Sequence, residues 1–371
     1  MGSLLQGFRP KERILALAVA LAVVGACTAD LVVSLSRASE KAAGAEAKGM
    51  ASNGGRIILL TPSDMAQLRR AANGAMNKPP DPLPVVHVEG VLPTTAEYRR
   101  ANESKRDWTR ISELAAAFAA TNERRYAERA GQYLTAWLDT YRISGNPIDE
   151  TGLSEWLLAD HLIGPTLEAG LRARLRNFAC TMSQRYLQPQ PANRKTSTNN
   201  WQSHRVKLAV MGALVCGDNE RIAVAMAAFK EQITRNLRPN GESIDFDERD
   251  AIHYVVYSIE PLLEAALFAQ HDGQALFGVA GPEGQSLTRT LAWLEPYARG
   301  EKTHEEFAHS TVRFDAERAA AGVSGFKGPF SAERASLAFW LASRLDQRWE
   351  ETSRHIGLPP TNRRAPWELL Q

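Results

Sequence analysis

The stretch NWQSHRVKLAVMGALVCGDNERIAVAMAAFKEQITRN, residues 200–236, indicates the fold of this chain most clearly. Apolar residues recur through both of its halves at the spacing of an α-helix. Gly217-Asp-Asn separates the halves, and these residue types end one helix and begin the next. The pattern predicts helices over 200–216 and 219–236. Because their connection is so short, the two helices are expected to pack antiparallel.

Similar helical patterns continue on both sides of this pair. From about residue 95 onward apolar residues follow the 3.6-residue period, with Asn122 separating two helices as a cap. The proline-rich stretch 77–84 is expected to be extended and loop-like. No alternation of strands with helices and no fixed repeat period is present, so one all-α domain of paired helices is predicted. Further helices are predicted at 151–163, 168–187, 249–270, 284–298 and 331–347.

The N-terminal region is typical of an export signal. Basic residues precede an apolar run over 14–26, and roughly 13 apolar residues suit a secretory signal, whereas a spanning helix needs roughly 20. The run ends in Val-Gly-Ala-Cys27, which resembles a bacterial lipobox with Cys27 as the lipidated residue. Cleavage without lipidation and an uncleaved anchor are the alternatives. The predicted regions are a signal peptide over 1–26, a tether over 27–60 and the folded domain over 61–371.

Charge and composition exclude several classes of protein. The 371 residues include 44 Lys and Arg against 42 Asp and Glu, a formal net charge of +2. The whole excess lies in residues 1–26, which leaves 41 basic and 41 acidic residues in the mature chain. A general nucleic-acid binder usually carries a large basic excess, so no nucleic-acid partner is expected. The ordinary hydrophobic content of 44% argues against disorder and against a multi-span membrane protein.

Cysteine and histidine content predicts neither a disulfide scaffold nor a metal site. Three cysteines are too few for a scaffold, and two of them, Cys180 and Cys216, lie in the mature domain. We predict that these two are buried free thiols, with pairing in an oxidising compartment as the alternative. The histidines show no metal-ligand spacing, and no cofactor is expected.

A polar segment, TSTNNWQSHR over 196–205, opens the first helix of the central pair. Asn200 and His204 are four residues apart and share one face of that helix. An amide, an imidazole and the free N–H groups of a helix N-terminus together suit a carboxylate ligand. The alternative is structural: a residue just before Asn200 caps the helix, Trp201 packs in the core, and His204 makes a structural hydrogen bond.

A second polar cluster lies in NGESIDFDERDAIHYVVYSIEPLL, residues 240–263. Arg249 and His253 are four apart on the predicted helix and lie off its apolar stripe. Tyr254 and Tyr257, three apart, lie off that stripe as well. A cation beside phenols can hold an anionic substrate next to a proton-transfer group. The structural alternative is a tyrosine-lined packing seam, with the arginine paired to the aspartate at 245 or 250.

Together, the two segments resemble the alginate lyase-like α/α-toroid proteins, whose best-known members form polysaccharide lyase family five. The resemblance rests on NNWQSH at 199–204 and RDAIHYVVYSIEPLL at 249–263, and it extends over roughly residues 95 to 345. It implies a single (α/α)n toroid, an incomplete α/α barrel of paired antiparallel helices, for the domain. Weaker similarities lie at 98–105, 146–152 and 293–304.

One position departs from the family pattern. In family-five enzymes a histidine directly follows the second asparagine, whereas Trp201 occupies that place here. His204 lies one turn later and is the histidine expected to reach the same space. The departure indicates a related lyase family and leaves open whether Tyr254 or His204 is the base.

The resemblance implies β-elimination, in which the proton at C5 of a uronate is abstracted and the bond to O4 breaks. Asn200 and Arg249 are expected to stabilise the charge that develops at the carboxylate, with His204 able to share this role. Tyr254 aligns with the family's catalytic tyrosine and is expected to protonate the leaving oxygen. It can also be the base when proton and leaving group lie on one face. The remaining candidates, all for substrate binding, are Asn199, Trp201, His253, Tyr257, Tyr98, Lys105 and His304.

The expected function is that of a polysaccharide lyase that cleaves a uronate-containing polymer, most simply alginate or polymannuronate. The product carries an unsaturated uronate at the new non-reducing end. The expected partner is an acidic polysaccharide, alginate or glucuronan-like, drawn in by a local basic groove that includes Arg249, Arg205 and Lys105. The protein is expected to be a monomer, periplasmic or secreted, with membrane contact only through a lipid on Cys27.

Two other classes of function remain open. An α/α-toroid glycoside hydrolase would need two carboxylates, and residues 242–248 offer four candidates. A non-catalytic periplasmic subunit that binds polysaccharide would keep the groove without needing Tyr254. The candidate carboxylates for hydrolysis are Glu242, Asp245, Asp247 and Glu248.

Overall fold

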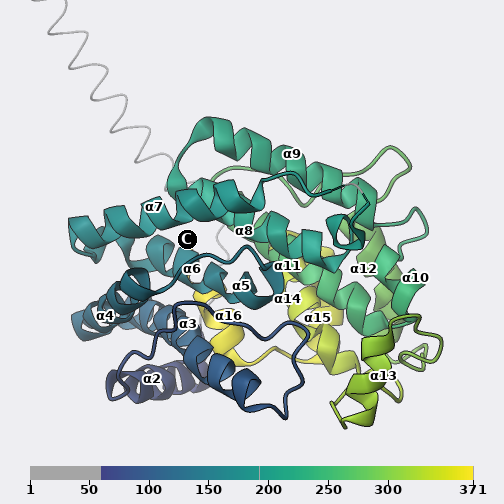
Figure 1. Cartoon of the computed structure of the whole chain (residues 1–371), viewed down its shortest axis with the longest axis horizontal. Coiled ribbons are helices and arrows are strands. Elements are labelled where there is room, and N and C mark those ends of the chain that lie inside the picture. The colour runs from purple at the N-terminus through teal and green to yellow at the C-terminus, as the bar shows by residue number, and fades with distance from the viewer. Residues whose placement is uncertain (1–59, 192, 371) are drawn as a thin grey trace, which may run out of the picture. The chain divides into compact units, whose positions relative to one another are not determined.

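The computed structural model describes residues 60–191 and 193–370, and in this part of the chain the regular structure is helical, with no strand longer than an isolated bridge. The predicted signal peptide, Cys27 and all of the tether up to residue 59 lie outside the described residues. The α-helices, labelled in Figure 1, are α2 (Pro62–Met76), α3 (Ala96–Thr121), α4 (Arg124–Thr140), α5 (Pro147–Glu150), α6 (Ser154–Ile163), α7 (Ala169–Tyr186), α8 (Asn200–Cys216), α9 (Asn219–Asn236), α10 (Ile244–Arg249), α11 (Ile252–His271), α12 (Leu287–Ala298), α13 (Arg313–Ala320), α14 (Ser336–Leu345), α15 (Glu350–Ile356) and α16 (Thr361–Glu368).

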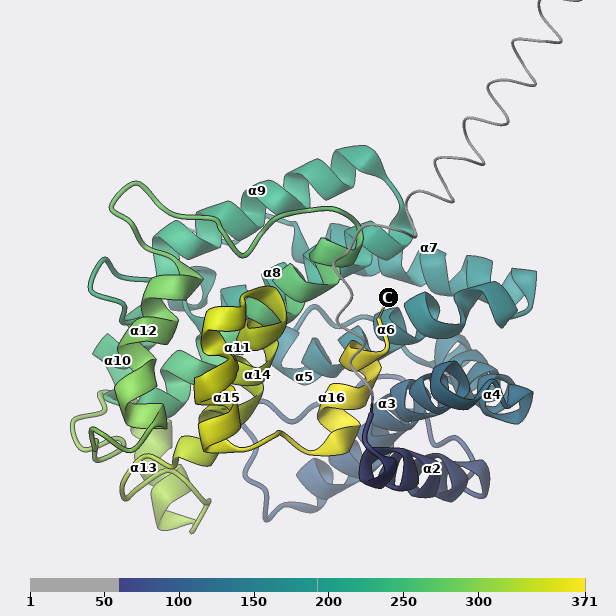
Figure 2. The same ribbon diagram turned by 180° about the vertical axis from the view of Figure 1, so that it is seen from behind.

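The helices form an inner and an outer series (Figures 1 and 2). In the inner series, α3 packs on α6, α6 on α8, α8 on α11, and α11 on α14. Outer helices cover this series: α4 lies on α3, α7 and α9 on α8, α12 on α11, and α15 on α14. The last helix, α16, returns to α2, α3 and α6. The predicted α/α toroid of paired helices is confirmed.

Helices α8 and α11 are central, and most of their residues are buried. On α8, Val206, Val210 and Met211 are fully or almost fully buried, since α6 and α11 cover one side and α7 and α9 the other. Within the described residues α11 is long and apolar enough to cross a membrane, but 78% of its apolar window is buried inside the protein. Gly217 ends α8 with a φ of 76°, a conformation that glycine adopts without steric cost.

The prediction of one helix over 249–270 is wrong at its first turn. Helix α10 ends at Arg249, and Asp250 adopts a left-handed φ of 47° before α11 begins at Ile252. An aspartate tolerates this conformation better than most residues. Its carboxylate also accepts the backbone N–H of His309 at 2.9 Å, which fixes the turn. Arg249 and His253 therefore lie on different helices rather than one turn apart on one helix.

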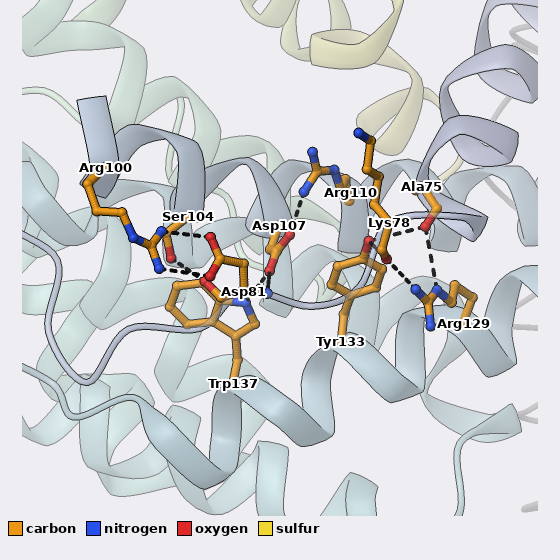
Figure 3. Close-up of polar contacts among 10 residues, drawn as sticks. All are labelled: Ala75, Lys78, Asp81, Arg100, Ser104, Asp107, Arg110, Arg129, Tyr133 and Trp137. Carbon is orange, nitrogen blue, oxygen red and sulfur yellow. Dashed lines mark hydrogen bonds and ion pairs between the residues drawn. The ribbon is translucent and has the colours of Figure 1, made fainter. Parts of the chain in front are cut away.

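The segment 77–95, called the arm below, joins α2 to α3 and is anchored at its proline-rich start (Figure 3). Asp107 of α3 accepts the backbone N–H of Asp81 at 2.6 Å and the indole N–H of Trp137 at 3.0 Å. The hydroxyl of Ser104 donates to the carbonyl of Asp81 at 2.5 Å. These bonds hold the extended chain against α3 and α4.

The later part of the arm is anchored by α5. The carboxylate of Asp149 accepts the backbone N–H groups of Val88 at 2.7 Å and of Glu89 at 2.8 Å. Its other oxygen lies 3.0 Å from Nδ1 of His87. Because both parts of the arm are bonded to helices, the arm forms a fixed wall beside the toroid.

Cys180 of α7 and Cys216 of α8 form a disulfide, so the prediction of free thiols is wrong. The two residues come together because α7 and α8 pack as antiparallel neighbours, which places the middle of one helix beside the end of the other. Sequence spacing alone does not reveal such a contact.

Reduction of this disulfide should lower the free energy of unfolding by about 4 kcal/mol, because the bridge closes a 36-residue loop. Urea unfolding with and without reductant measures the effect. The Cys180→Ser/Cys216→Ser double variant should show the reduced stability in both conditions. An equal urea midpoint for wild type and double variant would contradict the prediction.

Two mostly buried glutamates should make the protein less stable as the pH rises from about 5 to neutrality. Burial raises the pKa of Glu155 on α6 and of Glu260 on α11 to about 7 each. The folded state therefore holds protons that the unfolded state has already lost, and this stability is full at acid pH and lost through pH 7. Between about pH 5 and 7 the free energy of unfolding should fall by about 2 kcal/mol per glutamate. Urea unfolding across this range tests it, and a Glu155→Gln variant with the wild-type slope would count against the assignment.

Candidate active site

A groove of about 900 Å³ opens beside the N-terminus of α8. Its walls are the arm, the turn between α10 and α11, and the segment 311–326, which contains α13. A larger hollow of about 1420 Å³ between α4 and α7 contains none of the predicted site residues. The groove does, since it is lined by every predicted catalytic or binding residue except His204 and His304.

Tyr254 lies in the first turn of α11 and is enclosed by two guanidinium groups. The Arg249 guanidinium lies 3.9 Å from the centre of its ring, and Nη1 of Arg318 donates to its hydroxyl at 3.2 Å. The ring of His253 stacks on it at 5.1 Å. Burial raises the pKa of Tyr254 above its ordinary value, while Arg249 and then Arg318 act in the opposite direction. This hydroxyl therefore faces a strongly cationic part of the groove.

Arg249 pairs with Asp315 of α13, and not with the aspartate at 245 or 250. Its Nη1 lies 2.5 Å from Oδ1 of Asp315, and both side chains are mostly buried. The same carboxylate lies 3.6 Å from Nη1 of Arg318 and accepts the hydroxyl of Ser310 at 2.8 Å. Sequence reasoning missed Asp315 and Arg318 because α13 was not predicted as a helix and both contacts to α10 and α11 span more than sixty residues.

Asn199 and Asn200 begin α8, but the ligand at this helix end is a side chain of the protein itself. Asn199 is the N-cap and accepts the backbone N–H of Trp201 at 3.1 Å. The backbone N–H of Asn200 donates to Asp245 at 2.9 Å, and its side-chain amide donates to the same carboxylate. Asn200 still lines the groove, although these two donor groups are engaged. The expectation of a free anion site at this helix end is therefore wrong.

Asp245 is fully buried and organises this corner of the site. Besides Asn200, it accepts the amide of Asn236 at 3.1 Å and the hydroxyl of Ser258 at 2.7 Å. Of the four carboxylates considered for hydrolysis, Asp247 pairs with Arg238 on the surface and only Glu248 lines the groove. These residues do not form a facing pair of carboxylates.

His204 lies beneath the floor of the groove. It is 4% exposed, its Nδ1 is 2.7 Å from the hydroxyl of Thr151, and its ring packs 4.5 Å from that of Tyr257. Burial first, and then Lys207 and Lys105, hold the pKa of His204 well below its ordinary value, so the ring is neutral near pH 7. The structural interpretation of His204 matches this geometry.

His304 and Arg205 also lie away from the groove lining. Nε2 of His304 is 3.0 Å from the carbonyl of Asp250, so this histidine supports the turn after α10. Arg205 is buried, donates to the carbonyl of Thr196 at 2.6 Å and lies over the ring of Trp201. Neither side chain is placed to contact a ligand in the groove.

The remaining charges make the groove basic on balance. Lys105, Lys195 and Arg334 line it in addition to the two arginines around Tyr254, against Glu89 and Glu248. Burial lowers the pKa of Lys105 to about 8, and its ammonium lies 5.3 Å from the ring of Trp108. Among the described residues, no group of three or more His, Cys, Asp or Glu side chains is arranged to hold a metal ion.

Comparisons with known proteins place this chain in a family. The sequence model for Alginate lyase matches residues 59–304. None of the curated proteins matches the chain. The solved structure of an alginate lyase from Bacteroides ovatus is similar with a TM-score of 0.60 and 15% identity, over 89% of this chain and 97% of that one.

A variant of alginate lyase A1-III, an enzyme of Sphingomonas species A1, is similar as well. In its complex with a tetrasaccharide it gives a TM-score of 0.53 and 14% identity, over 77% of this chain and 87% of its own. At these identities the structural likeness shows the fold, while the sequence match extends over more than half of the chain. This chain belongs to the alginate lyase family and is a polysaccharide lyase.

Proposed function

We propose that the enzyme cleaves a uronate polymer, polymannuronate or alginate first among them, by β-elimination. The observation that supports this most is a tyrosine hydroxyl in a basic groove, bracketed by Arg249 and Arg318. The similar A1-III enzyme is an alginate lyase that was solved with a tetrasaccharide, which agrees with an oligosaccharide substrate.

The proton at C5 of a uronate is weakly acidic because a second negative charge must develop beside an ionised carboxylate. Positioned cations and donors that stabilise this charge supply a large part of such catalysis. Arg249 is assigned this role, since its guanidinium is mostly buried and fixed by Asp315 beside Tyr254. Asn200 is assigned a part in it through the second N–H of its side-chain amide, since an amide nitrogen carries two donors and one of them is bonded to Asp245.

Tyr254 is assigned both proton transfers. As phenolate it takes the C5 proton, the C4–O4 bond breaks as the C4=C5 double bond forms, and the phenol then gives that proton to O4. This sequence requires the C5 proton and O4 on the same face, as in mannuronate and glucuronate. His204 is a poor candidate for a second base because Thr151 and Tyr257 enclose it beneath the floor.

Incubation with polymannuronate, glucuronan and hyaluronan-like polymers tests the proposal. The conjugated double bond of an unsaturated uronate absorbs in the ultraviolet, so we expect a steady rise in absorbance with at least one polymer. New reducing ends without that absorbance would indicate hydrolysis instead. Binding without either signal would favour the non-catalytic polysaccharide-binding subunit.

We also propose that the enzyme works outside the cytoplasm. The export-like N-terminus predicts this, and the Cys180–Cys216 disulfide is typical of an oxidising compartment. Mass spectrometry of the mature N-terminus should find lipid on Cys27 or cleavage after a small residue. A full-length chain starting at Met1 in the cytoplasmic fraction would overturn the proposal.

A further inference from the structure

Helix α13 brings a second cation to the site from outside the segment that matches the family. The match ends at residue 304, and α13 follows at Arg313–Ala320. The Arg318 side chain passes the rings of Phe314 at 4.2 Å and Phe326 at 4.9 Å and is 22% exposed. Aromatic neighbours of this kind reduce the freedom of a long side chain. Arg318 is thus held with its guanidinium at the Tyr254 hydroxyl, 3.2 Å away.

Arg318 and Arg249 contact different parts of Tyr254. Arg249 lies over the face of the ring, whereas Arg318 donates a hydrogen bond to the oxygen. A guanidinium can only donate, and when the oxygen is anionic the Coulomb attraction between opposite charges adds to the hydrogen bond. The contact from Arg318 therefore strengthens when Tyr254 loses its proton.

Asp315 fixes the position of both cations. Its carboxylate is 1% exposed, with Arg249 at 2.5 Å and Arg318 at 3.6 Å from the same oxygen. The other oxygen accepts the Ser310 hydroxyl. One buried carboxylate thus contacts both guanidinium groups that reach Tyr254, one at the face of its ring and one at its oxygen.

We propose that Arg318 is a further catalytic residue, the cation that hydrogen-bonds the Tyr254 oxygen and stabilises its phenolate, and that Asp315 is the positioning residue that holds Arg318 and Arg249. The proposal rests on the assignment of Tyr254 as the base. Under this proposal α13 supplies two residues to the active site.

Few other groups around Tyr254 change charge near neutral pH. Burial lowers the pKa of His253 to about 4, so this stacked ring is neutral. Burial raises the pKa of Tyr257 well above its ordinary value, so this phenol stays protonated. The charged neighbours are then Arg249 from α10 and Asp315 and Arg318 from α13. Lys105, elsewhere in the groove lining, has a pKa of about 8 and affects activity profiles, so the ionisation of Tyr254 should be observed directly.

The test compares Arg318→Gln and Arg318→Lys with Arg313→Gln, a matched control. Arg313 lies on the same helix, is 92% exposed and pairs with Glu317 on the surface. Arg318→Gln should lower kcat on the order of 100-fold or more with little change in KM. Arg318→Lys should restore part of that loss, and Arg313→Gln should behave as wild type. Thermal unfolding of each variant identifies any loss through misfolding.

The direct readout is the ¹³C NMR titration of ring-labelled tyrosine, with the Tyr254 signal assigned from Tyr254→Phe. Arg318→Gln should move the Tyr254 titration upward by about one pH unit or more. An unchanged titration in a folded variant overturns the proposal, whether or not polymer is cleaved. If the titration moves but no polymer gives an unsaturated product in wild type, the catalytic role fails together with the proposed function.

Discussion

Tyr254→Phe should abolish turnover, lowering kcat by about 1000-fold or more while leaving binding of the polymer largely intact. The variant keeps the ring under Arg249 and loses only the hydroxyl that both proton transfers require. Positioned proton transfer alone contributes about 100- to 10,000-fold, and one group is assigned both steps here. Initial rates measured by ultraviolet absorbance give kcat, and equilibrium binding to an oligosaccharide gives Kd.

Tyr297→Phe is the matched control for this experiment. Tyr297 is a partly buried phenol on α12 that packs on Trp293 and does not line the groove, so its loss should leave kcat unchanged. Substantial turnover in folded Tyr254→Phe would exclude Tyr254 as the group that transfers the protons. Another base in the groove would then have to take the C5 proton.

Asp245→Ala should destabilise the protein on the order of 5 kcal/mol. Asp245 is fully buried, and its removal leaves donors of Asn200, Asn236 and Ser258 without their acceptor. Each unsatisfied buried polar group costs about 1–3 kcal/mol, and breaking a buried charged cluster about 3–5. Urea unfolding followed by circular dichroism measures the change in the free energy of unfolding.

Asp247→Ala on the same short helix is the control for Asp245→Ala. Asp247 pairs with Arg238, both side chains are nearly half exposed, and such surface pairs contribute about 0–1 kcal/mol. Equal losses for the two variants would mean that Asp245 does not organise the start of α8. A large loss of stability for Asp245→Ala alone would support the interpretation that its hydrogen bonds hold the start of α8 in place.

The sequence predicts the helices of this protein well where local signals are strong. The bounds of α8 and α9 match the prediction at both ends, because Gly217 and Asp218 terminate and cap helices through local chemistry. The same reasoning fails at Asp250, where a left-handed residue is fixed by His309, far along the chain. A local pattern carries no signal for such a contact.

The candidate site shows the same difference between local signals, which the sequence reveals, and long-range contacts, which it does not. Two motifs predict Asn199, Asn200, Arg249 and Tyr254 as site residues, and all four line one groove. The motifs do not predict which residues hold these side chains in place. Asp245 binds Asn200, and Asp315 of α13 binds Arg249. His204 shares a helix face with Asn200, yet packing turns it toward Thr151 and Tyr257. Periodicity gives the side of a helix, whereas the tertiary neighbours decide whether that side faces a groove.

Mass spectrometry of the oligosaccharides released from polymannuronate tests the central claim most directly. Elimination should give products one water lighter than the saturated oligosaccharides of hydrolysis, in wild type and not in Tyr254→Phe. Saturated products of full mass, or unsaturated products at an undiminished rate from Tyr254→Phe, would contradict β-elimination by Tyr254.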